Sequence, residues 1–360
     1  MSVRKKSLPS LVLAGVLALG LLGIGRSSEG SPNEPTRHTI SGADVAIYNL
    51  LGNLEVVRGD GASVVAEVTL HGKDAVRLKV ENGPIDGRQT LRVIYPGDRI
   101  VEPEFGNHTT STFRVNDDGT FNDDKHRGRR VLISGRGPGI EAGADIRLVV
   151  PPGKKVSVYW GHGKATVTRT DADLILDAAG MPVSATGIRG SLHVDIGSGM
   201  VRVESADAEI WIDTGSGDVS LLGINAKEVA VDTGSGEVTG NDISAESASI
   251  DTGSGNIRLG KLKAERVSLD TGSGGVTVEI SGTTRSLEID AGSGDVSVTI
   301  PKALGAELSV ETGSGGIETN LTMETSVRKH DELVGRIGDG RGRIAIETGS
   351  GTVSIRQAGL

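Results

Sequence analysis

The fold is decided by the stretch Ile212-Asp213-Thr214-Gly215-Ser216-Gly217, because close copies of these six residues recur at a nearly constant interval. The first glycine of each copy is Gly197, Gly215, Gly234, Gly253, Gly272, Gly292, Gly313 and Gly349, in steps of 18, 19, 19, 19, 20, 21 and 36 residues. So short a period does not suit a pair of helices, and it suits one rung of a β-solenoid. The last step is about two periods, so we expect one copy to be degenerate or to carry an insertion.

Each repeat alternates apolar and polar residues, as in Val219-Ser220-Leu221 and Val229-Ala230-Val231, which is typical of short strands with one apolar face. The Gly-Ser-Gly between two strands is turn chemistry, since glycine adopts positive φ and lets successive coils lie close together. A β-branched residue at Gly234 is therefore expected to destabilise the array. We predict an all-β chain in which residues 151–356 form a parallel β-solenoid, a single-stranded β-helix, with rungs of about 19 residues.

Residues 38–150 have the same strand character without the six-residue signature, as in Asp44-Val45-Ala46-Ile47-Tyr48. We interpret them as an irregular, strand-rich N-terminal cap of the solenoid, because an uncapped end would expose unpaired strand edges. Residues 103–139 within this region are polar, charged and rich in glycine. They predict a polar insertion that forms a protruding hairpin or a loop.

The N-terminus has the layout of an export signal. Arg4, Lys5 and Lys6 precede an uncharged apolar run from Leu11 to Ile24. This run is shorter than the roughly 20 residues that span a bilayer comfortably. We therefore predict residues 1–26 to be a signal peptide or, alternatively, an N-terminal membrane anchor, with 27–37 as a linker. Either arrangement exports the remaining chain to the periplasm, the cell surface or the extracellular space.

The composition excludes several classes of function. A net charge of -9 argues against binding to nucleic acid, which needs a dense basic surface. The chain has no cysteine, so it forms no disulfide, thiolate metal site or cysteine nucleophile. The Gly-Ser-Gly corners lack the lysine of a phosphate-binding loop, and no motif predicts a cofactor. With only three Phe, three Tyr and two Trp, the interior is expected to be thin.

The repeated Val/Ile-Asp-Thr-Gly-Ser-Gly units follow an export signal and a strand-rich region without repeats. In this they resemble the putative-adhesin family of bacterial β-strand repeat proteins, a domain of unknown function with DTGSG-type repeats. The resemblance covers about residues 38–356. It implies a parallel β-solenoid, and it supplies no catalytic residues to transfer.

The acids of the repeats should stack in one column, the structural repeat ladder Asp195, Asp213, Asp232, Asp251, Asp270, Asp290, Glu311 and Glu347. Like charges about 4.8 Å apart repel by about 1 kcal/mol per neighbour at the dielectric constant of water. One interpretation is that each carboxylate accepts the N–H two residues on, in an Asx-turn that fixes the glycine corner. The alternative is weak binding of divalent cations, although the calcium-binding β-roll spacing is missing.

These observations predict a non-enzymatic protein of the cell envelope or surface, an adhesin or scaffold that binds glycan, matrix or protein partners. One alternative is a polysaccharide-active β-helix enzyme. The only place for its non-repeating charges is the insertion, with Asp117, Asp118, Asp123, Asp124, Lys125, Arg127, Arg129 and Arg130. A second alternative is a sensory or regulatory ectodomain held by an uncleaved N-terminal helix. We predict no catalytic, cofactor-binding or metal-binding residue.

Overall fold

The structure is a computed structural model, and it describes residues 34–105, 110–122 and 128–359. Their strands form one sheet of 26 strands and a second sheet of three. Besides these strands, the described residues contain two short 3₁₀ helices, Ala75–Arg77 and Pro103–Phe105. The all-β prediction is confirmed. The predicted signal or anchor at 1–26, with 27–33 of the linker, lies outside the described residues.

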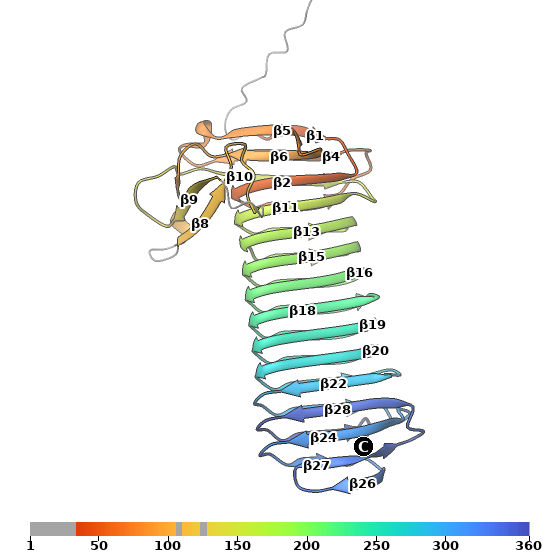
Figure 1. Cartoon of the computed structure of the whole chain (residues 1–360). Coiled ribbons are helices and arrows are strands. Elements are labelled where there is room, and N and C mark those ends of the chain that lie inside the picture. The colour runs from red at the N-terminus through yellow and green to blue at the C-terminus, as the bar shows by residue number, and fades with distance from the viewer. Residues whose placement is uncertain (1–33, 106–109, 123–127, 360) are drawn as a thin grey trace, which may run out of the picture.

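The middle of the chain forms a straight rod of stacked layers (Figure 1). Its strands are β11 (Lys155–His162), β12 (Ala165–Thr168), β13 (Asp171–Gly180), β14 (Val183–Thr186), β15 (Arg189–Ser198), β16 (Val201–Ser216), β17 (Val219–Asn225), β18 (Glu228–Ser235), β19 (Val238–Ser254), β20 (Ile257–Ser273), β21 (Val276–Ile280), β22 (Ser286–Ala291) and β23 (Val296–Ile300). Neighbouring layers pair in parallel and in register, so that Asp195 lies opposite Asp213 and Asp251 opposite Asp270.

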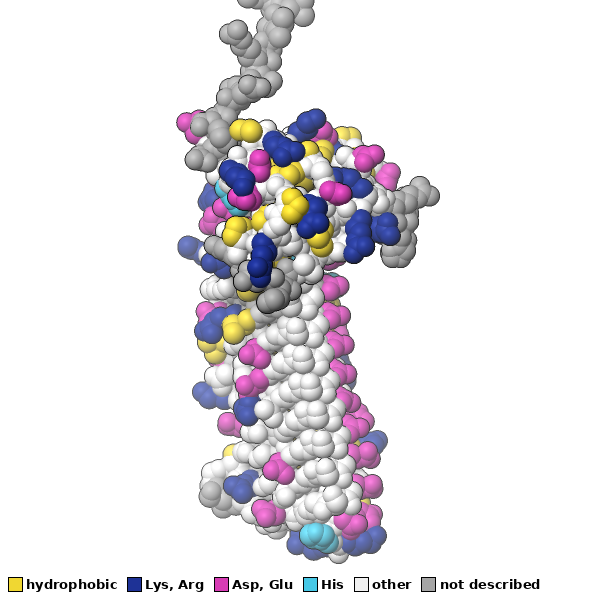
Figure 2. Space-filling view, turned by 90° about the vertical axis from the view of Figure 1, so that its left-hand side faces the viewer, with side chains coloured by type: hydrophobic (Ala, Val, Ile, Leu, Met, Phe, Trp, Pro, Cys, Tyr) yellow, Lys and Arg dark blue, Asp and Glu magenta, His cyan; other side chains and the backbone are white. Residues whose placement is uncertain are grey.

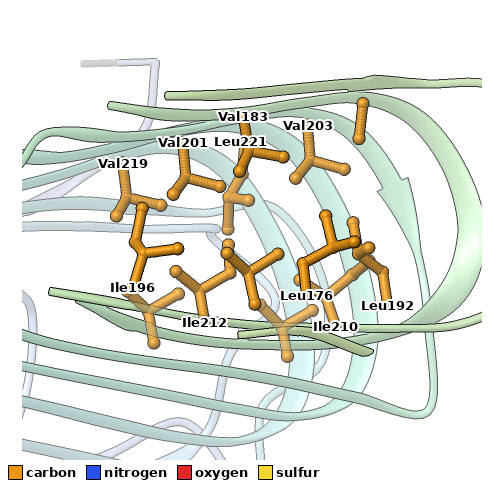
Figure 3. Close-up of a cluster of buried hydrophobic side chains, with 14 of the residues drawn as sticks. Leu176, Val183, Leu192, Ile196, Val201, Val203, Ile210, Ile212, Val219 and Leu221 are labelled. Carbon is orange, nitrogen blue, oxygen red and sulfur yellow. The ribbon is translucent and has the colours of Figure 1, made fainter. Parts of the chain in front are cut away.

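Alternating side chains explain why these segments form strands with a core between two walls. In β20, Val267 and Leu269 are buried, whereas Ser268 and Asp270 face outward. Figure 3 shows the result farther up the rod, where aliphatic side chains of the two walls meet without an aromatic ring among the labelled residues. Burial of each such side chain contributes about 1.5–3 kcal/mol, so the stability of the rod grows with every layer.

The Gly-Ser-Gly corners are places of close approach between layers. A Cβ added to Gly234 would lie 2.7 Å from the carbonyl oxygen of Gly215, and the same distance separates a Cβ on Gly253 from the oxygen of Gly234. Positive φ belongs to the last glycine of several corners, such as Gly236 at +158°, and not to Gly234. The expected intolerance at Gly234 thus has a different cause, namely the space that the next layer occupies.

A second corner of the rod is built from residues in the left-handed conformation. One residue in each of six consecutive layers has φ between 49° and 70°: Arg169, Gly187, Ser205, Gly223, Asp242 and Lys261. Four of these six residues are not glycine, so the position carries no simple sequence signature. Left-handed backbone costs a residue with a side chain roughly 1–2 kcal/mol, which the packing of the layers must offset.

The N-terminal end of the sheet mixes parallel and antiparallel pairs. Its strands are β1 (Thr36–Ile40), β2 (Asp44–Leu51), β3 (Leu54–Arg58), β4 (Val64–His71), β5 (Lys79–Ile85), β6 (Arg88–Ile94) and β10 (Gly143–Val150). On one wall β2 lies between β6 and β11, parallel to both. On the other wall β10 lies between β3 and β4, antiparallel to β4. The antiparallel hairpin β5–β6 then closes this end.

The insertion folds into the three-stranded sheet of β7 (Arg99–Val101), β8 (Thr110–Val115) and β9 (Arg129–Ser134). It lies at the side of the rod, near its N-terminal end (Figure 1). The expected hairpin is present, since β8 and β9 pair antiparallel. It is packed rather than solvated, because Phe113, Phe121 and Ile133 are buried in the continuous core.

At the C-terminal end the order of the layers in space differs from their order in the chain. The strands are β24 (Ala306–Thr312), β25 (Ile317–Thr319), β26 (Glu324–Arg328), β27 (Glu332–Ile337), β28 (Gly342–Thr348) and β29 (Val353–Gln357). β28 pairs in parallel with β22 on one side and with β24 on the other. The 36-residue step in the repeat therefore contains the antiparallel strands β26 and β27, of which β27 pairs with β24 and β26 pairs with β27.

Candidate functional site

The repeated acids lie in one column on the outer face of the rod. We call this set the acidic column; in spatial order it is Asp177, Asp195, Asp213, Asp232, Asp251, Asp270, Asp290, Glu347, Glu311 and Glu332. Figure 2 shows acidic side chains stacked along one edge of the rod, beside a strip that carries few other coloured side chains. The structure therefore brings together all eight acids of the predicted ladder.

Two members of the column, Asp177 and Glu332, are absent from the sequence-based set. Asp177 opens a weaker copy of the repeat, Asp177-Ala178-Ala179-Gly180, at the same interval, and this signal could have placed it. Glu332 has no such signal, because it lies on an antiparallel strand opposite Glu311. Nor does the repeat reveal that Glu347 stacks between Asp290 and Glu311.

The carboxylates of the column do not form the expected Asx-turns. The N–H of Gly292, two residues after Asp290, donates instead to the carbonyl of Thr271 at 2.8 Å. In the same way the N–H of Gly313 donates to the carbonyl of Thr348 at 2.9 Å. These amides belong to the ladder between layers, which leaves the carboxylates directed outward.

The buried hydroxyls of Thr214 and Thr233 have no hydrogen-bond partner among the described residues. Several corners farther down the rod are held by the threonines that follow the acids. Their side chains are buried, and Thr271 donates its hydroxyl to the carbonyl of Gly255 at 3.0 Å. Thr348 makes the equivalent bond to Gly294 at 3.0 Å. At these corners, a threonine hydroxyl on the inner side makes the hydrogen bond that fixes the turn. The Asx-turn interpretation had assigned this role to the carboxylate on the outer side.

Above its lower end, the charge of the column is not compensated by ion pairs with neighbouring cations among the described residues. Among the described residues, the eight ladder acids from Asp195 to Glu347 form no ion pair, and within the column only Glu332 does, with Lys329. Partial burial raises the pKa of Asp270, and the carboxylates of Asp251 and Asp290 raise it further. The column is therefore a continuous row of mutually repelling charges.

The upper end of the column lies under the inserted sheet. Burial, helped by the charge of Asp195, raises the pKa of Asp177 to about 6, although Nδ2 of Asn122 donates to its Oδ1 at 2.8 Å. The next position of the column is Tyr159, whose ring stacks on Tyr48 at a centroid distance of 4.7 Å. The row of acidic residues therefore begins at Asp177, in the layer next to the stacked rings of Tyr48 and Tyr159.

The charged residues of the insertion form no catalytic cluster in the described part of the chain. Asp123, Asp124, Lys125 and Arg127 lie outside the described residues. The Asp118 carboxylate accepts hydrogen bonds from the N–H and hydroxyl of Thr120, which makes it part of a turn. The guanidinium of Arg129 donates to the backbone carbonyls of Tyr95 and Gly97. These contacts are structural.

Neither a metal-binding cluster nor a membrane-spanning helix is found in the described residues. No three of their His, Asp or Glu side chains are grouped so that they would hold a metal ion. At the lower end of the column, Asp290, Glu311, Glu332 and Glu347 line an open hollow of about 530 Å³. None of the helices within these limits is long and apolar enough to cross a bilayer.

Comparison with known proteins identifies the family of the chain. A solved structure described as a putative cell adhesion protein from Clostridium sporogenes is 13% identical, and the match covers 90% of this chain and 100% of that chain with a TM-score of 0.18. No curated protein matches the sequence. The model of the family described as Toastrack DUF4097 matches residues 144–356, which is more than half of the chain and includes the whole ladder of repeated acids. The chain therefore belongs to the Toastrack DUF4097 family.

Proposed function

We propose that this protein is an exported, non-enzymatic adhesin or scaffold of the cell envelope or cell surface, which binds a glycan, matrix or protein partner. The observation that carries the proposal is the acidic column on a straight rod. The ladder acids are alike in type and surroundings, which suits repeated contact with an extended partner. Catalysis instead needs a few unlike groups that converge on one point.

The regular spacing of the column supports a more specific architecture. We infer that the rod is a parallel β-solenoid with rungs of about 19 residues, capped at both ends by the antiparallel strands. Each wall strand pairs with neighbours about 4.8 Å away, so the charges are held at a constant interval and height. A partner with regularly placed groups would meet the same chemistry at every layer.

Export rests on the N-terminal sequence. The basic residues followed by an apolar run fit a signal peptide that is removed after translocation. N-terminal sequencing of the protein from its native cells is expected to find a mature end near residues 26–31. An uncleaved N-terminus in the membrane fraction would favour the sensory ectodomain instead.

One observation favours an enzyme as the second candidate. Burial raises the pKa of Asp177 to about 6, and Asp195 lies opposite it on the next strand, so a carboxyl that keeps its proton to higher pH than usual lies beside a second carboxyl group. A pair of this kind serves glycoside hydrolases as acid and nucleophile. Against the enzyme, the Asp177 carboxylate already accepts a hydrogen bond from Nδ2 of Asn122.

The deciding experiment measures binding and cleavage together. The purified exported protein is incubated with isolated envelope polysaccharide, and both the sedimented protein and the newly released reducing ends are recorded. Binding without release, weakened by Asp232→Asn with Asp251→Asn and unchanged by Asp60→Asn with Glu246→Gln, would support the glycan-binding form of the adhesin. Release that disappears in Asp177→Asn would establish the enzyme.

A further inference from the structure

An indole is presented on the outer face of the rod, directly beside the acidic column. Trp211 lies on β16 between Ile210 and Ile212, which are both buried, so its own side chain points outward and is half-buried. The other tryptophan, Trp160, is fully buried and donates its Nε1–H to the carbonyl of Gly52 at 2.8 Å. No such hydrogen bond is found for Trp211 among the described residues, although indole N–H groups usually find a partner.

The layers next to Trp211 leave open space beside the indole. Ala230 lies opposite Trp211 on the next strand, and Ser249 lies opposite Ala230. These small side chains form the floor of a shallow hollow of about 620 Å³. Its upper end is formed by Trp211 and His193, whose ring centroids are 6.5 Å apart. We call this feature the Trp211 trough.

One side of the Trp211 trough is a wall of negative charge. Asp213, Asp232 and Asp251 line it on consecutive layers, and none of the described residues that line it is a lysine or an arginine. The three carboxylates are exposed and have no ion pair within the described chain. Their repulsion is relieved when a cation enters the trough.

The combination of indole and carboxylates selects the chemistry of the partner. A guanidinium or ammonium group is attracted both by the face of an indole and by carboxylates beside it. An anionic polysaccharide would be repelled by the wall, and a neutral one would leave its charges uncompensated. A single metal ion is a poor occupant, because no metal-holding group of three side chains exists in the described residues.

We propose that the Trp211 trough binds an extended, arginine-rich or lysine-rich segment of a partner protein. One cationic side chain lies over the indole of Trp211, and the following ones pair with the acidic column. This inference rests on the proposed function and names the partner of the column as a basic polypeptide. Further contacts are available along the rod, because each layer adds one carboxylate.

The indole itself reports occupancy. Full-length protein is titrated with a synthetic peptide of alternating arginine and serine, and tryptophan fluorescence is followed at several salt concentrations. We expect a saturable change, because Trp211 is the one tryptophan of the described chain that is not fully buried, and an affinity that falls steeply with salt. The same peptide with glutamine in place of arginine is expected to cause no change.

Matched variants separate the trough from general charge attraction. Asp232→Asn combined with Asp251→Asn should weaken binding of the arginine peptide by about three- to tenfold, whereas Asp60→Asn combined with Glu246→Gln, equal in charge, should alter it less than about twofold. Trp211→Leu, followed by calorimetry, should weaken it by about two- to fivefold. Melting curves verify that each variant is folded.

Several outcomes would overturn the inference. Equal loss of affinity in both double variants would show non-specific attraction to an acidic protein, and a fluorescence change with the glutamine peptide would remove the role of charge. The arginine peptide could fail to bind while envelope polysaccharide sediments the Trp211→Leu variant to the same extent as the unchanged protein. That result would leave the adhesin function standing and show that the proposed basic partner is wrong.

Discussion

Glu347 lies directly opposite Asp290, although Glu311 comes between them in the sequence. Glu311 is one layer farther along, on the other side of Glu347. The last layer of the chain, β28 with β29, thus fills a space between two layers that precede it. This arrangement makes the C-terminal segment part of the interior of the stack.

Removal of residues 342–360 is therefore expected to detach the whole C-terminal cap. β24 loses its parallel neighbour, and β22 loses the strand that covers its edge. Hydrogen exchange should show lost protection in β24 and β27, with protection retained in β15 to β19. Removal of only Gly359 and Leu360 is the control. Unchanged protection of β24 in the larger deletion would contradict the inserted layer.

Replacement of Gly234 by valine is expected to destabilise the protein by about 1–3 kcal/mol, the usual cost of overpacking. The new Cβ would lie 2.7 Å from the carbonyl oxygen of Gly215 in the adjacent layer. Gly223→Asn is the matched control, since its φ of 64° suits asparagine and the nearest atom to an added Cβ is 3.9 Å away. Denaturant unfolding measures both. Equal losses would show that space at the Gly-Ser-Gly corner is unimportant.

The second corner can be tested at Lys261, whose φ is 49°. Lys261→Val should cost about 1–2 kcal/mol, because a β-branched residue is poorly tolerated in the left-handed region. Lys261→Gly should unfold at the same denaturant concentration as the unchanged protein or higher. Lys263→Val, on the exposed face of the same strand, is the control. A stable Lys261→Val variant would argue against the left-handed corner.

Stability is expected to fall as pH rises from about 4 to about 6. The folded pKa of Asp177 is raised to about 6 from its ordinary value of 3.8, so the folded state binds the proton more tightly than the unfolded state. The stabilising protonation is complete below the unfolded pKa and is lost as pH passes the folded pKa. Melting midpoints of Asp177→Asn should depend less on pH in this range than those of Asp60→Asn. Identical pH profiles would refute the assignment.

The repeat made the column predictable, because a residue at a fixed distance before the first glycine must face the same way in every layer. Asp195 and its counterparts could therefore be selected from spacing alone. The Asx-turn interpretation was wrong. It required the N–H of residues such as Gly292 to donate to a carboxylate of the same repeat, but this N–H donates to the carbonyl of Thr271 in the neighbouring layer. Hydrogen bonds between layers are not encoded within one repeat.

Features that depend on distant contacts were not predictable from the spacing. The second corner uses residues as different as Arg169, Ser205 and Lys261, so no shared residue type marks it. The polar composition of the insertion concealed the role of Phe113 and Phe121. Their rings pack edge to face with their centroids 5.9 Å apart, and they anchor the small sheet. A few apolar side chains among many polar ones decide whether such a segment docks.

The buried position of β28 also restricts how such a protein can change in length. A unit added after β29 would meet the cap rather than a free end, whereas the layers between β13 and β20 are flanked on both sides by copies of themselves. Duplication of one such unit would lengthen the rod by about 4.8 Å and add one carboxylate, with both ends unaltered. The length of the rod and its number of carboxylates would therefore increase together, by duplication of central layers rather than by additions at the termini.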